Sequence, residues 1–382
     1  MRKTFRYRAY ANKQTVANME KWLELCRYLY NSALEQRIAI YRQDKGCISL
    51  YDQMKQIKDI RVTFPEYSDV NVQMLREVLI RLDNAYKAFF RRISSGEKVG
   101  FPRFKGKGRF DSLTFQHNGW CLDSKYLFIT NVGRFKLRLS RPIQGTIKTV
   151  TLSRSLSGEW YACFSCDKVP EKTLPESDKS IGLDVGIKSF LVDSDGNEVA
   201  NPRHYRMSQA NLRRKQRRLA RRVKGSQGRI KARILVAKSQ EKVQNQRRDF
   251  LHKTATYYIQ NYGMIAVETL NIKGMVRNHK LARSILDAAW GEFFGLLSYK
   301  AEEAGRELIK VPRFEPTSKT CSVCGEVKKN LTLSDRRWVC QSCGTLHDRD
   351  YNAAKNILRV GQTLQAQTCG SSQSVACESR SN

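Results

Sequence analysis

The spacing of hydrophobic and polar residues changes several times along the first half of the chain. Residues 2–12 alternate basic residues with apolar or aromatic ones, which predicts a strand with one buried face. Between about residues 13 and 92 the apolar positions recur every three or four residues, which predicts a lobe of amphipathic helices. A stretch rich in Gly, Pro, Lys and Arg follows at 94–116, and short alternating segments then continue to about residue 168. These segments and the first strand could close a small antiparallel β-barrel, with the helical lobe inserted in it.

The second half of the chain alternates strands and helices, as an α/β domain does. Residues 170–179, PEKTLPESDK, predict a linker. The segment SIGLDVGIKSFLVDSDGNEV predicts a strand hairpin, for which DSDGN supplies turn residues. A basic helical region, an apolar strand, a helix and another strand are expected next, near residues 203–253, 263–270, 284–305 and 306–313. A cysteine-rich segment and a last helix follow.

The charge of the chain indicates a polyanionic partner. Its 382 residues include 69 Lys and Arg against 36 Asp and Glu, which gives a formal net charge of +33. A field of this sign attracts nucleic acid. No apolar run approaches the ~18 residues of a membrane-spanning helix, and the N-terminus lacks the apolar segment of a secretory signal. We therefore expect a cytoplasmic, nucleoid-associated protein whose partners are nucleic acids and not a membrane.

Four of the eleven cysteines have the spacing of a zinc site. Cys321 and Cys324 form one Cys-x-x-Cys hook, Cys340 and Cys343 form another, and fifteen residues separate the two. Four thiolates at this spacing complete the tetrahedral shell of a structural Zn²⁺, which predicts a zinc ribbon. His347 is close enough in sequence to be a further candidate ligand, but four sulfurs already fill the shell.

A third Cys-x-x-Cys pair has no second hook. Cys163 and Cys166 lie in EWYACFSCDK, whose alternation predicts a strand. We expect ordinary buried thiols at these two positions.

Two carboxylates are expected at the ends of buried strands. Asp184 lies in IGLDVG between two glycines, and Glu268 ends the apolar run MIAVE. A carboxylate in such a place is costly to bury unless it is paired or holds a cation. Either residue alone could form a structural ion pair with one of the many arginines.

A third carboxylate favours a metal site. In HDRDYNAAKNIL, Asp350 shares a helical face with Ala353, Ala354 and Ile357, so it should point toward the sheet, whereas Asp348 should be a solvent-side N-cap. Three acids that converge at one sheet edge can hold two Mg²⁺ or Mn²⁺ ions, ~4 Å apart, for phosphodiester cleavage. The order Asp, Glu, Asp across an α/β sheet suggests an RNase H-like core.

These motifs, in this order, resemble the RuvC-type nuclease domain of the TnpB family, proteins of bacterial insertion sequences that are related to type V CRISPR effectors. The motifs are IGLDVG, IAVETL, the four-cysteine ribbon and DRDYNAAKNIL. TFRYRAYAN and GFPRFKGKGRFDSLTF are similar to the opening barrel segments of the family, so the resemblance covers roughly residues 1–360. It implies cleavage of DNA beside a short transposon-adjacent motif, directed by a guide RNA that derives from the transposon end.

The resemblance also implies site residues and a domain layout. Asp184, Glu268 and Asp350 match the catalytic triad of the family and would bind the divalent ions. A wedge β-barrel would comprise residues 1–12 and 96–172, and a helical recognition lobe residues 13–95. The RuvC-like core would comprise residues 178–314, which include the basic helices at 203–253, and residues 346–360. The zinc ribbon would lie at 315–345 and a disordered tail at 361–382.

Two basic stretches are candidates for nucleic-acid binding. Residues 203–253 carry eighteen Lys or Arg against two acids, so this region would repel itself without a polyanion along it; the alternative is a solvated surface helix. GFPRFKGKGRF interleaves Phe101, Phe104 and Phe110 with cations, which could stack bases or simply form a loop at the core edge. In the helical lobe, the family is expected to contact its adjacent motif near Tyr51, Gln53, Asn71 and Gln73. The candidate contact residues are Arg103, Lys105, Lys107, Arg213, Arg214, Lys215, Arg217, Arg218, Arg221 and Arg222.

Three other functions are less consistent with the motifs. A nuclease-inactive, RNA-guided repressor or transposition regulator has no need of an intact triad. A transposase that joins DNA ends usually has the acid order Asp, Asp, Glu, and an actin-like phosphotransferase needs neither the ribbon nor the basic helices. We therefore predict a monomeric RNA-guided DNA endonuclease that acts on double- and single-stranded target DNA.

Overall fold

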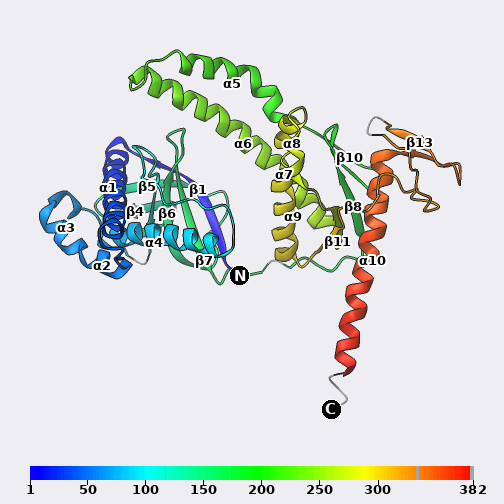
Figure 1. Cartoon of the computed structure of the whole chain (residues 1–382), viewed down its shortest axis with the longest axis horizontal. Helices are drawn as coiled ribbons and strands as arrows, with labels where there is room; N and C mark the ends of the chain where they lie inside the picture. Colours follow the sequence, from blue (N-terminus) through cyan, green and yellow to red (C-terminus); the bar gives the residue numbers. More distant parts are fainter. Residues whose placement is uncertain (117, 172, 333–334, 379–382) are drawn as a thin grey trace. The chain divides into compact units, whose positions relative to one another are not determined.

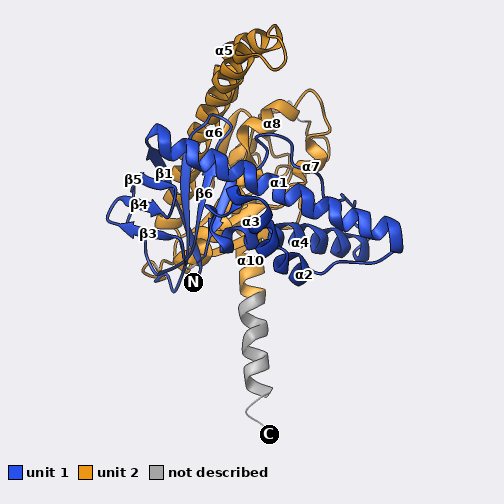
Figure 2. Ribbon diagram, turned by 90° about the vertical axis from the view of Figure 1, so that its left-hand side faces the viewer, with its two compact units in different colours: residues 1–170 blue, residues 171–382 orange. Residues whose placement is uncertain are grey.

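The computed structural model describes residues 1–116, 118–171, 173–332 and 335–378. The chain divides into two compact units, Met1–Pro170 and Glu171–Asn382 (Figure 2). No helix among the described residues is both long and apolar enough to cross a membrane.

Unit 1 contains a seven-stranded antiparallel sheet. The strand order is β2-β6-β7-β1-β5-β4-β3, and β1 (Lys3–Ala11) lies at its centre because it pairs with both β7 (Trp160–Asp167) and β5 (Gly133–Arg138). The alternation predicted for the first strand is present, with Phe5 and Tyr7 buried. Among the strands that the structure describes, no ladder joins β2 to β3, so hydrogen bonding does not close the expected barrel. The other strands are β2 (Ser112–Phe115), β3 (Trp120–Asp123), β4 (Tyr126–Ile129) and β6 (Thr146–Arg154).

The predicted helices of unit 1 lie between β1 and β2 in sequence. The longest, α1 (Lys13–Asp44), begins at Asn12, whose side chain accepts a hydrogen bond from the Thr15 N–H at 2.7 Å. Its buried face packs on α4, and both helices share one hydrophobic core with the sheet. The remaining helices are α2 (Leu50–Lys55), α3 (Ile57–Thr63), the 3₁₀ turn η1 (Pro65–Tyr67) and α4 (Val72–Ser94).

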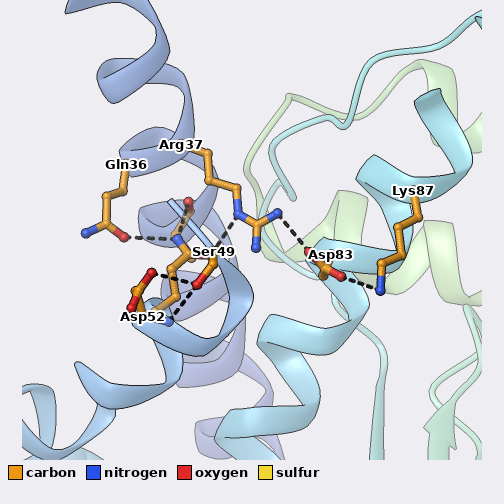
Figure 3. Close-up of polar contacts among 8 residues, drawn as sticks. Gln36, Arg37, Ser49, Asp52, Asp83 and Lys87 are labelled. Atoms are coloured by element: carbon orange, nitrogen blue, oxygen red, sulfur yellow. Dashed lines mark hydrogen bonds and ion pairs between the residues drawn. The ribbon is translucent and has the colours of Figure 1, made fainter. Parts of the chain in front are cut away.

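A buried polar network joins three of these helices (Figure 3). The guanidinium of Arg37 on α1 donates to Gln53 Oε1 on α2 at 2.8 Å and to Asp83 Oδ1 on α4 at 3.2 Å. The Gln53 amide donates to the carbonyl of Ala33 at 2.9 Å, and Lys87 pairs with the other oxygen of Asp83 at 3.0 Å. The network pairs most of the polar groups where the three helices meet, although Nη2 of Arg37 is buried without a hydrogen-bond partner among the described residues.

Unit 2 contains a mixed five-stranded sheet in the order β10-β9-β8-β11-β12. The strands β8, β11 and β12 are parallel, whereas β9 and β10 form antiparallel pairs. The hairpin expected after the linker is present as β8 and β9, and DSDGN is the turn between β9 and β10. The bounds are β8 (Ser180–Val185), β9 (Ser189–Asp193), β10 (Glu198–Ala200), β11 (Met264–Glu268) and β12 (Glu307–Val311).

Helices cover both faces of this sheet (Figure 1). Ile265 and Val267 of β11 belong to a core with α6 and α9, whereas Met264 and Ala266 face α10. This division follows from the alternation of side chains along a strand. The helices of unit 2 are α5 (His204–Ala220), α6 (Gln227–Asn261), α7 (Ile272–Met275), α8 (Ala282–Ala288), α9 (Trp290–Ala304) and α10 (Arg349–Glu378).

The last helix packs closely on the sheet through glycine. A Cβ atom on Gly182 of β8 would lie 2.3 Å from the Ala354 carbonyl oxygen, so this position requires glycine. Further along α10, Gly361 is buried against Ala266, and Gln365 hydrogen-bonds to Glu307. A disordered tail was predicted from residue 361, whereas the structure continues α10 to Glu378. Residues 379–382 lie outside the described part of the chain.

The buried network of unit 1 leads to a stability prediction. Replacement of Arg37 by Ala leaves Gln53 and the nearly buried Asp83 without their shared donor, and we expect it to lower the free energy of unfolding by about 3 kcal/mol. Lys87→Ala removes an exposed partner of the same Asp83 and should cost less than about 1 kcal/mol. Urea denaturation of both variants measures the difference, and equal losses would contradict this assignment.

Candidate active site

Asp184 and Glu268 are neighbours at the carboxyl end of the parallel strands. The β8–β11 register pairs Leu183 with Val267, so the next residue of each strand is one of the two acids. Both side chains are half-buried. The structure therefore brings together two carboxylates that lie 84 residues apart in sequence.

The third acid comes from the start of α10. Asp350 is in the first turn of this helix, on the same face as Ala353 and Ala354, which are fully buried against the sheet. Asp348 is exposed, and its carboxylate accepts hydrogen bonds from the N–H groups of Asp350 at 3.1 Å and Tyr351 at 3.2 Å. Asp348 is thus the N-cap of α10, as predicted.

The three acids interact electrostatically. Burial raises the pKa of Asp184 well above its usual value, and a hydrogen bond to Glu268 and the charges of Glu268 and Asp350 raise it further, whereas Arg349 opposes the shift. A carboxylate in this position resists ionisation because it is buried and because its neighbours are also negative. A divalent cation between the three groups would remove this repulsion, so the donor set suits a hard cation that prefers oxygen ligands.

Asp350 also has a cationic partner that the sequence did not indicate. Nη1 of Arg336 lies 3.3 Å from Oδ1 and 3.2 Å from Oδ2 of Asp350. Arg336 belongs to the segment between the two cysteine hooks, where the only sequence signal is the dipeptide Arg336-Arg337.

The ligand atoms of the four cysteines all lie within 4.8 Å of one another. Among the described residues no other group of three or more possible metal ligands is this compact, and the three carboxylates are farther apart.

The four predicted cysteines form one cluster. The sulfurs of Cys321 and Cys343 are 3.7 Å apart, and those of Cys324 and Cys340 are 3.5 Å apart. The chain turns back after each hook, and the strands β13 (Arg337–Val339) and β14 (Leu346–Asp348) pair beside the cluster. The arrangement of two hooks and a hairpin is that of a closed, four-sulfur zinc site.

His347 contacts this cluster. Its Nε2 lies 3.0 Å from the sulfur of Cys321, and its ring is buried against Trp338. Burial and the charge of Lys355 lower the pKa of His347, so the imidazole is neutral and can donate to the sulfur. The histidine therefore supports a ligand without being needed as one.

Two buried asparagines on α10 tie the ribbon to the helix that carries Asp350. The Asn352 amide donates to the carbonyl of Thr320 at 2.8 Å and accepts from the Ser322 N–H at 2.9 Å. The Asn356 amide donates to the carbonyls of Thr317 at 2.8 Å and Thr320 at 2.6 Å. The sequence shows that the two asparagines lie four residues apart on one helical face. Only the packing shows that they contact the ribbon.

Cys163 and Cys166 lie outside any such cluster. They are strand residues of β7, and burial raises the pKa of each thiol. Cys166 is buried, as expected, whereas Cys163 is only half-buried.

The basic helices α5 and α6 pack as an antiparallel pair (Figure 1). Leu212 of α5 is buried, and this helix packs along α6. The predicted contact residue Lys215 is turned toward α6, where its ammonium group donates to Ser239 Oγ at 2.5 Å. The other predicted arginines of this region are exposed and line a common groove: Arg213, Arg214, Arg217, Arg218, Arg221 and Arg222.

The basic loop of unit 1 is partly fixed by the protein. Asn31 binds the backbone of Lys105 on both sides, with its oxygen 2.8 Å from the Lys105 N–H and its nitrogen 3.0 Å from the carbonyl. Arg103 and Lys107 are exposed. Phe104 is also exposed, but Phe110 belongs to the hydrophobic core, so it cannot stack a base as the sequence suggested.

The four residues of the helical lobe near the expected motif contact lie in different environments. Tyr51 is 68% exposed, whereas Gln53 is 2% exposed and hydrogen-bonded to Arg37 and to the carbonyl of Ala33. Asn71 caps α4 by accepting from the Gln73 N–H at 2.9 Å. Of these four, Tyr51 and Gln73 have exposed side chains.

Three families match parts of this chain. Residues 163–279 match the IS605 OrfB family, described as "Probable transposase", and residues 290–357 match a family described as "Cas12f1-like, TNB domain". Residues 1–46 match a family described as "Helix-turn-helix domain"; here that segment contains β1 and α1.

The structure resembles solved CRISPR effectors. The Cas12f1 chain of a complex with guide RNA and target DNA aligns over 94% of this chain and 98% of its own length, with a TM-score of 0.58 and 15% identity. CasPhi-2 bound to crRNA aligns over the same shares with a TM-score of 0.50 and 10% identity. These likenesses show the fold.

Several relatives match in sequence over most of their length. A protein of Streptomyces pristinaespiralis named "Putative RNA-guided DNA endonuclease" is 33% identical over 97% of this chain and 91% of its own. An Escherichia coli K12 protein, "Putative RNA-guided DNA endonuclease InsQ", is 30% identical over 96% and 93%. The "TnpB-like protein L770" of Acanthamoeba polyphaga mimivirus is 25% identical over 93% and 72%. The chain therefore belongs to the TnpB family, whose members in insertion sequences include relatives named as RNA-guided DNA endonucleases.

Proposed function

We propose that this protein is an RNA-guided, divalent-metal-dependent DNA endonuclease of a bacterial insertion sequence, which cuts target DNA beside a short transposon-adjacent motif. The observation that carries the proposal is the convergence of Asp184, Glu268 and Asp350 at one sheet end in a chain of net charge +33. Relatives at 30–33% identity carry the name of this activity.

The sheet supports an RNase H-like, RuvC-type core. Its order places the strand of Asp184 next to the strand of Glu268, with an antiparallel hairpin on one side and a parallel strand on the other. The helix that carries Asp350 crosses the same strands. The acids thus meet at the carboxyl ends of parallel strands, where α/β proteins commonly place their sites.

The three carboxylates would hold two Mg²⁺ or Mn²⁺ ions. When bound, such a pair supplies activation of a water and stabilisation of the leaving oxygen in phosphodiester hydrolysis. The protein residues contribute negative charge, orientation and partial exclusion of water at the half-buried sheet end. Arg336 neutralises part of the charge of Asp350 and fixes its position.

The ribbon would position the third acid. Zn²⁺ bound by Cys321, Cys324, Cys340 and Cys343 would hold the two hooks together. Asn352 and Asn356 then connect the ribbon to the first turns of α10. We propose that the ribbon is structural and acts on cleavage through this connection.

The nucleic-acid partners follow from the exposed cations. A guide RNA derived from the transposon end, paired with target DNA, would lie along the groove lined by the arginines from Arg213 to Arg222, where backbone shape is bound and sequence is left to base pairing. Double-stranded target and the displaced single strand are the DNA partners. We propose that the protein acts as a monomer in the cytoplasm, associated with the nucleoid.

The carboxylate proposal predicts guided cutting that depends on Asp184. Protein purified with its guide RNA should cleave a matching plasmid in Mg²⁺ and should follow the guide when its target segment is replaced. Asp184→Asn should reduce the cleavage rate at least about a hundredfold without loss of RNA or target binding, because it removes a metal ligand. Asp249→Asn, at an exposed acid paired with Lys253, is the control and should cut normally. Binding without cutting by the unaltered protein would instead indicate the RNA-guided repressor.

The ribbon proposal predicts one Zn²⁺ per chain. Cys340→Ser should lose the zinc, measured by plasma mass spectrometry, and should slow cleavage because α10 loses its support. Cys163→Ser changes a thiol outside the cluster and should retain both zinc and activity. Zinc content unchanged in Cys340→Ser would contradict the four-cysteine site.

A further inference from the structure

A second polar cavity lies in unit 2, between the start of α5 and the segment that leads into α8. Its volume is about 570 Å³, and α8 lies beside the start of α5 (Figure 1). Neither the proposed cleavage chemistry nor the guide–target surface uses it. The basic side chains that line it are Arg203, Arg206, His279, Lys280 and Arg283.

The floor of the cavity is fixed by one buried carboxylate. Asp287 of α8 accepts hydrogen bonds from the N–H groups of Tyr205 at 3.0 Å and Arg206 at 3.2 Å. Arg247 of α6 donates to the same carboxylate at 3.2 Å. Asp287 therefore holds three helices together, and its charge is already neutralised.

The rim keeps a surplus of positive charge. Arg206, Lys280 and Arg283 are exposed and form no ion pair with any acid in the described part of the chain. Arg203 reaches only the backbone carbonyl of Lys188, at 3.5 Å. Several unpaired cations around a concave polar site bind a phosphate strongly, because guanidinium groups can donate two hydrogen bonds to it.

The cavity is linked to the carboxylate site through the chain that follows Asp184. Ile187, which lines it, follows Asp184 by three residues, so their Cα atoms are at most about 11 Å apart. The segment with His279 and Lys280 follows β11, which ends in Glu268. Both segments thus leave the sheet at the end that carries the acids.

We infer that this cavity binds a backbone phosphate of the DNA strand that enters the carboxylate site, and so positions that strand for cleavage. The inference rests on the proposed function. The position of the cavity favours DNA over the guide RNA, because its residue Ile187 follows Asp184 by three positions, whereas the arginine groove of α5 is formed farther along that helix. Lys280 and Arg283 supply charge from one side of the cavity, and Arg203 and Arg206 from the other.

The test compares two double variants of the RNA-loaded protein. Lys280→Ala/Arg283→Ala removes two charges, and Lys280→Arg/Arg283→Lys keeps both. The probe is a fluorescent 12-nucleotide single-stranded DNA, titrated in Ca²⁺ at several salt concentrations. We expect the alanine variant to raise the Kd about tenfold or more and to reduce the slope of log K against log salt by about 1.4, the value for two lost single-strand contacts. The charge-preserving variant should stay within about twofold of the unaltered protein.

Each other outcome has a definite meaning. Unchanged DNA affinity in the alanine variant would overturn the inference, and loss of the guide RNA from that variant would assign the cavity to RNA and overturn it as well. If the Kd for DNA rises in the alanine variant as expected but the unaltered protein cuts no guided target, the proposed function fails while the phosphate cavity stands. The binding readout therefore separates the two claims.

Discussion

The mutual repulsion of three carboxylates is the constraint on which the nuclease half of this protein depends. Asp184 and Glu268 are brought together by strand register, and Asp350 by a helix that packs on the same strands. Burial first, and then the hydrogen bond and charge of Glu268 and the charge of Asp350, raise the pKa of Asp184, which shows that its ionised form is disfavoured here. A fold keeps such a cost where a cation can bind, and the surrounding contacts must hold the acids in place until it does.

Those contacts explain why a cysteine cluster precedes the third acid so closely. Gly182 lets α10 approach the sheet, while Asn352 and Asn356 bind the backbone just before the first hook. Arg336, from between the hooks, reaches Asp350 itself. The ribbon is thus connected to the acid both through the helix and through a direct ion pair.

The sequence predicted the features that follow from local pattern. Apolar strands that end in an acid, a helical face with Asp350 and two Cys-x-x-Cys hooks each carry their signal within a few residues. It did not predict features set by packing between distant segments. Lys215 and Phe110 look like nucleic-acid contacts in the sequence. In the structure Lys215 binds Ser239 of α6, and Phe110 is buried in the core of unit 1. The continuation of α10 past Gly361 likewise depends on Ala266, almost a hundred residues earlier.

The metal site itself can be tested by anomalous X-ray scattering from crystals of the RNA-loaded protein grown in Mn²⁺. We predict manganese peaks between Asp184, Glu268 and Asp350, and a separate zinc peak at the four cysteines. Crystals of Asp184→Asn should lose manganese and keep zinc. A zinc peak without manganese at the carboxylates of the unaltered protein would show that the three acids do not bind the catalytic ions.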